Sequence, residues 1–305
     1  MAWYWILCIV LASLIVLILL LSLGVCLGLV RFLSHPHLYS RAETKKYDED
    51  KGILKYIDLL KREDVEIKMS DGYIIHGDIS YIGNRKKFVI CAHGYTVNRE
   101  NQLKYAQEYA RLGYSVLLYD HRGEGDNKRV PITMGYLEQR DLHEIIQWLY
   151  QREGSDIEIG IHGESMGAAT VLLVLKYNDP LKFAVADCPY SSLNDLFPYQ
   201  MKCMHVPSIL LKPSSALLKM IHGYSFDMIS PADNASESKV PLMLITGDHD
   251  GFIPPEESQI IYDHKKCGYK ELHFVKDADH AMAYTTDPVK YAEYLKEFLA
   301  KVENL

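Results

Sequence analysis

A serine stands between two glycines in the stretch GESMG, residues 163–167. The apolar, β-branched run before it, 157–163, predicts a buried strand, and the Ala/Leu/Val run after it, 165–178, predicts a helix. So sharp a strand-to-helix turn strains the serine backbone, and side chains on the flanking glycines would collide with neighbouring segments. The turn exposes the Ser165 hydroxyl at a helix N-terminus, where the N–H of Met166 is free to donate to an oxyanion. The pattern therefore predicts nucleophilic attack by Ser165.

A serine hydroxyl is a weak nucleophile, so a base must take its proton. His280, in DADHAMAY, follows the last predicted strand and precedes the last predicted helix, and we interpret it as the base. Four other histidines near strand ends, His93, His121, His162 and His249, adjoin motif residues, and we expect them to shape loops.

The base in turn needs a carboxylate that fixes its tautomer and stabilises the imidazolium. LITGDHDGFIP ends the penultimate strand with two carboxylates, Asp248 and Asp250. Asp250 is preferred, because it lies further into the loop and precedes the apolar residues 252–254, which would fix that loop. Asp248 is the second choice and Asp187, after the preceding strand, is the third.

A second oxyanion donor is expected from the loop after the first buried parallel strand, AHGYTVN (92–98). Gly94 would let the backbone approach closely, and the N–H of Tyr95 would point into the site. Tyr95 and Met166 are thus the two predicted amides.

The elements that must position these residues alternate along the chain. A hairpin is predicted over 64–82, followed by strands and helices in alternation. The further strands are expected at 87–94, 114–120, 157–163, 183–189, 241–248 and 270–275, and the helices at 101–113, 137–154, 165–178 and 287–302. This is an α/β chain with a mostly parallel sheet covered on both faces, whose ligand site lies beyond the carboxyl ends of the strands. Residues 192–237 interrupt the alternation, and we expect them to form a small helical cap over the sheet edge.

The N-terminus is a separate region. No charged residue occurs from Trp3 to Val30, which is long enough to span a bilayer. A cleaved signal peptide is the alternative, but no basic residue precedes the run and no good cleavage pattern follows it. We expect a transmembrane anchor over 1–31, a juxtamembrane linker over 32–60 and a catalytic domain over 61–305. Basic residues after the span favour a cytoplasmic catalytic domain.

Composition excludes several classes. The net charge of −7 argues against nucleic-acid binding, and the six cysteines have no disulfide or metal-type spacing. Walker-type, GxGxxG and HExxH motifs are absent from the sequence, and the predicted chemistry requires neither a cofactor nor a metal.

Taken in order, HGYTVNRENQ, YDHRGEGDN, GESMG, GDHDGFIP and DADHAMAYTTDP resemble the α/β-hydrolase fold. The similarity is greatest to its bacterial serine-aminopeptidase-like and monoacylglycerol-lipase-like members, and it covers roughly residues 60–305. It departs from many relatives at Asp126-Asn127, where they carry a serine, and this bears on substrate preference.

The resemblance implies a nucleophile at Ser165, an acid at Asp250, a base at His280 and oxyanion amides at Tyr95 and Met166. It implies hydrolysis of an ester, thioester or amide through an acyl-enzyme, and the membrane span favours a carboxylesterase with acyl or lipid-like substrates. A serine peptidase of the same fold and a non-catalytic binding protein are the alternatives.

Overall fold

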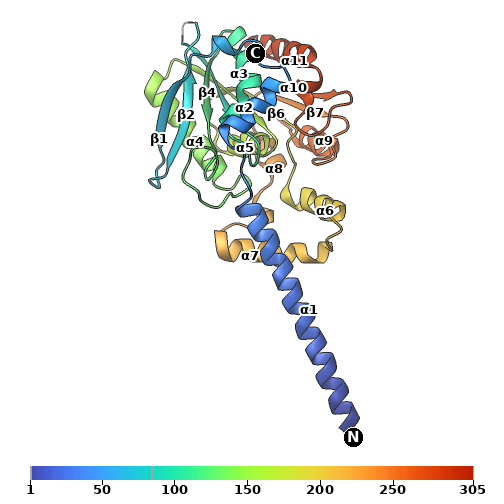
Figure 1. Cartoon of the computed structure of the whole chain (residues 1–305). Helices are drawn as coiled ribbons and strands as arrows, with labels where there is room; N and C mark the ends of the chain where they lie inside the picture. The colour runs from blue at the N-terminus through green and yellow to red at the C-terminus, as the bar shows by residue number, and fades with distance from the viewer. Residues whose placement is uncertain (1, 84, 305) are drawn as a thin grey trace.

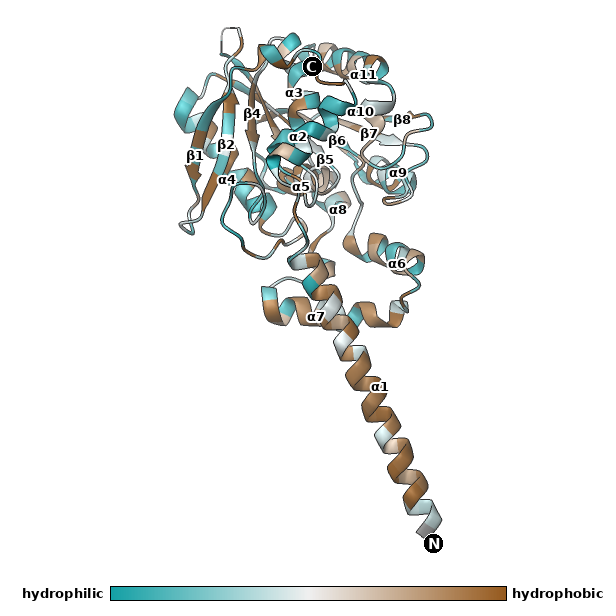
Figure 2. Cartoon of the chain, in the orientation of Figure 1, coloured by the Kyte–Doolittle hydropathy of each residue, from teal (hydrophilic) through white to brown (hydrophobic). Residues whose placement is uncertain are grey.

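The computed structural model describes residues 2–83 and 85–304. A long helix, α1 (Ala2–Ser34), projects from a compact body, and the N-terminus lies at its far end (Figure 1). Helix α1 is apolar along most of its length (Figure 2), and most of its large apolar side chains are exposed.

The body is built on one eight-stranded sheet of order β1-β2-β4-β3-β5-β6-β7-β8. Strands β1 and β2 form an antiparallel hairpin, β2 pairs antiparallel with β4, and all remaining neighbours are parallel. The strands are β1 (Glu63–Lys68), β2 (Ile74–Ser80), β3 (Lys87–Ala92), β4 (Ser115–Tyr119), β5 (Glu158–Glu164), β6 (Leu181–Asp187), β7 (Leu242–Gly247) and β8 (Lys270–Val275). The predicted mostly parallel sheet is confirmed.

Helices cover both faces, as predicted. One apolar core joins the sheet to α4 (Glu138–Glu153), α5 (Met166–Val174), α8 (Pro231–Ser236) and α9 (Pro255–His264). The other joins it to α3 (Leu103–Arg111), α10 (Ala283–Thr286) and α11 (Pro288–Glu303). The central strands are therefore buried on both sides, which explains why they appear in the sequence as continuous apolar runs.

The segment 192–237 forms the helices α6 (Leu193–Cys203), α7 (Leu211–His222) and α8. Helix α7 lies across α1 near the end of α1 that faces the body (Figures 1 and 2). A third apolar cluster, which includes Val30 of α1, Leu173 of α5, Phe197 of α6 and Leu218 of α7, joins them to the body.

The segment after α1 is more ordered than its charged sequence suggested. Residues Arg41–Asp50 form a helix, α2, which begins at a capping box. The Ser40 side chain accepts the backbone N–H of Glu43, and the Glu43 carboxylate accepts the backbone N–H of Ser40 at 2.8 Å. Such reciprocal bonds satisfy amides that a helix start otherwise leaves unpaired.

Candidate active site

Ser165 lies at the turn between β5 and α5. Its φ of 56° and ψ of −116° are strained for a residue with a side chain. The two flanking glycines permit the turn: a Cβ on Gly163 would lie 2.3 Å from the Gly167 carbonyl oxygen. A Cβ on Gly167 would lie 2.1 Å from the Ala92 carbonyl oxygen. Both positions exclude any side chain, as the sequence pattern predicted.

The structure brings the three predicted side chains into one hydrogen-bonded chain. Ser165 Oγ lies 2.9 Å from His280 Nε2, although the two residues are 115 positions apart. On the other side of the ring, His280 Nδ1 lies 2.8 Å from Asp250 Oδ2. The residues come from the carboxyl ends of three different strands, β5, β7 and β8. This arrangement can move a proton from a hydroxyl to an imidazole whose other nitrogen is held by a carboxylate.

The surroundings of the acidic residues separate the three candidates. The buried Asp250 carboxylate also accepts the backbone N–H groups of Phe252 at 2.9 Å and Ile253 at 2.8 Å, which orients it toward the imidazole. Asp248 instead bonds to His249 and to the backbone of Asp277, both at 2.7 Å, away from His280.

Asp187, the third candidate, lies behind the nucleophile. Its backbone carbonyl accepts the Ser165 N–H at 2.8 Å, and its carboxylate accepts the Tyr105 hydroxyl at 2.8 Å. Burial, reinforced by the Glu164 charge, raises the pKa of Asp187 to about 7. Its contacts support the turn rather than the imidazole.

The two predicted oxyanion amides are available. Within residues 2–83 and 85–304, the backbone N–H groups of Tyr95 and Met166 donate no hydrogen bond to another group of the chain. The Tyr95 hydroxyl lies 2.8 Å from the Phe32 carbonyl oxygen, so it ties the loop to the end of α1. A Cβ at Gly94 would meet only ordinary contacts, at 3.6 Å, so the close approach expected there is not sterically required.

Two buried histidines shape the loop that carries Tyr95. His93 Nε2 accepts the backbone N–H of His121 at 2.8 Å, and His121 Nε2 lies 3.0 Å from the His93 carbonyl oxygen. Burial lowers the pKa of both rings. Neutral imidazoles thus brace this loop, as expected from their positions in the sequence.

A cavity of about 440 Å³ opens beside Ser165 and His280. Its walls include Tyr95, Val97 and Met282, and one side is formed by the segment that contains α2. That segment contributes Tyr39, Glu43, Thr44, Tyr47 and Asp48. None of the described residues that line the cavity comes from 192–237, the segment expected to cap the site. The volume suits a small-molecule substrate.

Charged groups are buried along this cavity. Lys104 Nζ lies 2.6 Å from Glu164 Oε2, and both side chains are almost fully buried. The carboxylates of Glu164 and Asp48 raise the pKa of Lys104 against the opposing effect of burial. Burial raises the pKa of Asp48 itself to about 6.

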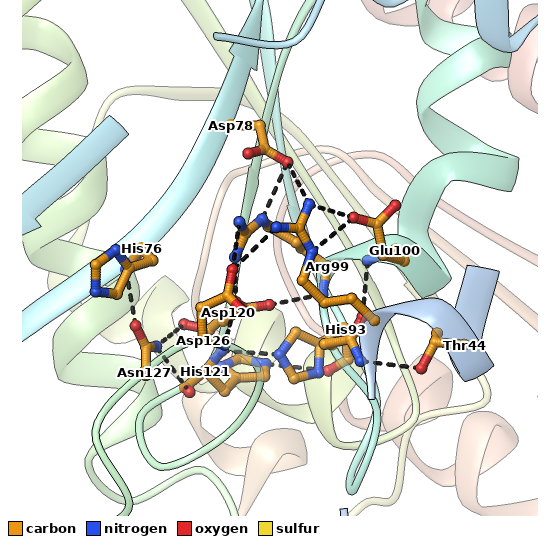
Figure 3. Close-up of polar contacts among 12 residues, drawn as sticks. Thr44, His76, Asp78, His93, Arg99, Glu100, Asp120, His121, Asp126 and Asn127 are labelled. Carbon is orange, nitrogen blue, oxygen red and sulfur yellow. Dashed lines mark hydrogen bonds and ion pairs between the residues drawn. The ribbon is translucent and has the colours of Figure 1, made fainter. Parts of the chain in front are cut away.

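An ion-pair network fastens α2 to the body (Figure 3). Arg41 of α2 lies 2.8 Å from Glu100 and 2.9 Å from Asp126, and Arg99 also contacts Asp126 at 2.9 Å. Burial would raise the pKa of Asp78 in this network, but Arg62 and Arg99 hold it below its usual value. Asp126 is one of the two residues at which this sequence differs from many relatives. Through Arg41 it connects α2, which forms one wall of the cavity, to the body.

A metal is not favoured by the donor set at the site. Cys188, Asp250 and His280 offer ligand atoms within 4.8 Å of one another. However, both ring nitrogens of His280 already contact other groups of the site, Nε2 the Ser165 hydroxyl and Nδ1 the Asp250 carboxylate.

Comparison with known proteins places this geometry in a family. The fold is similar to that of α/β-hydrolase GrgF from Penicillium, with a TM-score of 0.64, 20% identity and coverage of 81% of this chain and 100% of that one. The Bacillus subtilis protein YqkD, printed as uncharacterized, is 30% identical over 290 residues, which cover 92% of this chain and 94% of YqkD. The chain belongs to the same family as YqkD, and its fold is that of the α/β-hydrolases. The sequence similarity to YqkD extends over nearly the whole length of both chains.

Two further similarities concern the activity of this α/β-hydrolase. The Pyrococcus furiosus esterase Pf2001 is 28% identical, with a TM-score of 0.66, and the match covers 83% of this chain and 93% of the esterase. Residues 85–220 match the model of the X-Pro dipeptidyl-peptidase (S15) family. These two similarities indicate that the protein is a hydrolase, with esterase-like and peptidase-like relatives.

The sequence reasoning missed the contribution of α2 to the site. Charged residues dominate 41–50, and this hid a helix that walls the cavity. The Ser-x-x-Glu pattern at Ser40–Glu43 is the signal that predicts its start. Lys104 had no local signal, because its partner Glu164 is sixty positions away.

Proposed function

We propose that this α/β-hydrolase is a membrane-anchored serine hydrolase that cleaves esters through an acyl-enzyme. The observation that carries the proposal is the chain of two hydrogen bonds, Ser165 to His280 at 2.9 Å and His280 to Asp250 at 2.8 Å. Carboxylesterase activity on acyl or lipid-like substrates is the function it supports best. The similarity to the esterase Pf2001 supports the ester as the bond cleaved.

In the proposed mechanism, His280 takes the Ser165 proton as Oγ forms a bond to the substrate carbonyl carbon. The carbonyl π electrons move to oxygen, and the N–H groups of Tyr95 and Met166 stabilise that oxyanion. As the tetrahedral intermediate collapses, the bond to the leaving group breaks and His280 gives it the proton. Water then attacks the acyl-Ser165 ester in the same way, releasing the acid and restoring the hydroxyl. Asp250 keeps its charge throughout and stabilises the imidazolium.

A serine peptidase of the same fold is the second candidate. The match of residues 85–220 to the X-Pro dipeptidyl-peptidase family favours it. A non-catalytic binding protein is the least supported alternative, because a strained, hydrogen-bonded serine has no evident use in one.

A substrate panel separates the two enzymatic candidates. We expect the purified full chain to hydrolyse p-nitrophenyl esters from acetate to decanoate with a kcat/KM at least about a hundredfold above that for aminoacyl p-nitroanilides, since an amide is the harder bond to cleave. The release of p-nitrophenol or p-nitroaniline measures both. An anilide cleaved faster than every ester would replace the esterase with the peptidase.

We further propose that α1 is a transmembrane anchor, with the catalytic domain in the cytoplasm. The helix Trp3–Ser34 has a mean hydropathy of 3.3 in its most apolar stretch, and none of that stretch is buried in the protein. Basic residues on the body side, including Arg31 and Arg41, support the cytoplasmic orientation. A signal sequence is the alternative, but the packing of the last turns of α1 against α7 and Tyr95 supports a segment that is retained.

The position of α7 supports a membrane whose surface lies at the level of this helix. The hydrocarbon core takes roughly 20 helical residues at ~1.5 Å each, which α1 supplies between Trp3 and about residue 23. Cys26 Sγ contacts the Leu210 carbonyl oxygen just before α7 begins, so α7 would lie at the membrane interface. Apolar side chains in α7 and in the turn before it face outward, since Met220 of α7 is 75% exposed and Ile209, just before the helix, is 80% exposed. Such side chains suit an interfacial helix.

Lipid contact at α7 is testable in nanodiscs with full-length protein. We expect an environment-sensitive fluorophore on Met220→Cys to be quenched several-fold more by nitroxide-labelled lipids than the same fluorophore on Val289→Cys. Val289 is similarly exposed, at 70%, but lies on α11, far from α7 (Figure 1). The exposed or partly exposed cysteines Cys8, Cys203 and Cys267 are first replaced by serine. Equal quenching at both positions would remove α7 from the interface.

A further inference from the structure

One carboxyl group buried in the cavity makes no hydrogen bond to the described part of the chain. Asp48 of α2 is only 1% exposed, and its Oδ2 has no hydrogen-bond partner among the described residues. It lines the same cavity as Ser165 and His280. An unpaired polar oxygen at such depth is costly and needs an explanation, and a ligand group that completes it is one.

The other charged groups of the cavity wall are already engaged. The Lys104 ammonium contacts Glu164 at 2.6 Å. The Glu43 carboxylate accepts the Ser40 N–H at 2.8 Å and the Ser40 hydroxyl at 2.6 Å. Among the carboxylates that line the cavity, Asp48 is therefore the one left with no hydrogen-bond or ion-pair contact to a described residue, and these carboxylates outnumber the one lysine of the wall.

We propose that Asp48 binds a protonated amine of the substrate, so that the preferred substrate is an ester or amide that carries an ammonium group. An ammonium supplies the charge and the donors that the carboxylate lacks. The rings of Tyr39 and Tyr47 line the same cavity, and aromatic faces also attract cations. Because Asp48 and Ser165 share one cavity of about 440 Å³, the amine and the reacting carbonyl would belong to one small molecule.

This inference rests on the proposed function and narrows its substrate class. At pH 7.5 the carboxyl is largely ionised, since burial raises the pKa of Asp48 only to about 6. Lys104 and Glu164 act on it from α3 and β5, with Lys104 favouring the ionised form and Glu164 opposing it. An arriving ammonium would favour the ionised form further.

The test separates binding from catalysis. Full-length Ser165→Ala protein in detergent is titrated calorimetrically at pH 7.5 with leucine ethyl ester and with N-acetyl-leucine ethyl ester. We expect the free amine to bind at least about tenfold more tightly. A second pair, the ethyl esters of 6-aminohexanoic acid and of heptanoic acid, reports whether the amine belongs next to the carbonyl, as at a peptide terminus, or at the far end of an acyl chain.

Substitution assigns the effect to Asp48. Adding Asp48→Asn should bring the affinity ratio of the preferred pair to about one, because an amide of the same shape carries no charge. Asp50→Asn, on the same helix but pairing with Lys46 at the surface, should leave the ratio unchanged. Equal binding within both pairs, or a ratio that survives Asp48→Asn, would overturn the proposal. Turnover of neutral esters by the wild type is a separate measurement, and its failure would count against the serine hydrolase instead.

Discussion

Replacing Ser165 with alanine is expected to lower kcat for ester hydrolysis by about five orders of magnitude and to abolish labelling by a fluorophosphonate probe. The substitution removes the only atom that forms the bond to the acyl group in the proposed mechanism. The loss corresponds to about 7 kcal/mol of transition-state stabilisation. Pre-steady-state kinetics would also lose the burst of p-nitrophenol that reports the acyl-enzyme.

The control for this variant is Ser208→Ala. Ser208 is exposed in the segment between α6 and α7 and lies outside the cavity. It should keep wild-type labelling and turnover. Labelling of Ser165→Ala at the wild-type rate would mean that another residue is the nucleophile. A folded wild type that neither labels nor turns over any ester would favour the binding protein.

The apolar pattern predicted most of the fold because the central strands are buried on both faces. Their runs are continuous, and the helices that cover them repeat at helical spacing. Helix α9 was not predicted, since Pro254-Pro255 and the acidic residues after them resemble a loop. Pro at the first turn is in fact compatible with a helix start, where its missing N–H costs nothing.

The residues of the candidate site were foreseeable to different degrees. Ser165 lies in a local pattern, and the strand ends predicted where Asp250 and His280 would meet it. Between Asp248 and Asp250 the sequence supported only a preference, because the choice depends on which carboxylate the backbone amides of 252 and 253 orient.

The wall of the cavity depends on contacts between distant parts of the chain. Arg41 reaches Asp126 across 85 positions and Glu100 across 59. A single sequence carries no sign of such pairs, so the Ser-x-x-Glu pattern can mark the start of the helix but not where the helix docks. The docking of α2 places Asp48 in the cavity, and the proposed binding of an ammonium group would give this helix a part in substrate selection.

Asp250→Asn is expected to lower kcat by about 10⁴-fold, whereas Asp248→Asn should stay within about twofold of the wild type. The asparagine keeps the shape but presents no negative charge to His280 Nδ1, which lies 2.8 Å from Asp250 Oδ2. The ring then loses the tautomer that leaves Nε2 free to accept the Ser165 proton, and the imidazolium loses its stabilising charge. Asp248 contacts His249 and the Asp277 backbone instead, so its loss should perturb only that loop.

The two variants form a matched pair because they make the same chemical change two residues apart in one loop. Steady-state turnover of p-nitrophenyl butyrate measures both, and the Tm of each separates an unfolded protein from an inactive one. KM should change little, since neither carboxylate is among the described lining residues of the cavity. If Asp248→Asn were the inactive variant, the acid of the triad would be Asp248, and the loop would have to rearrange when substrate binds. If both retained turnover, His280 would act without a carboxylate, and the hydrogen bond to Asp250 would serve only to hold the ring.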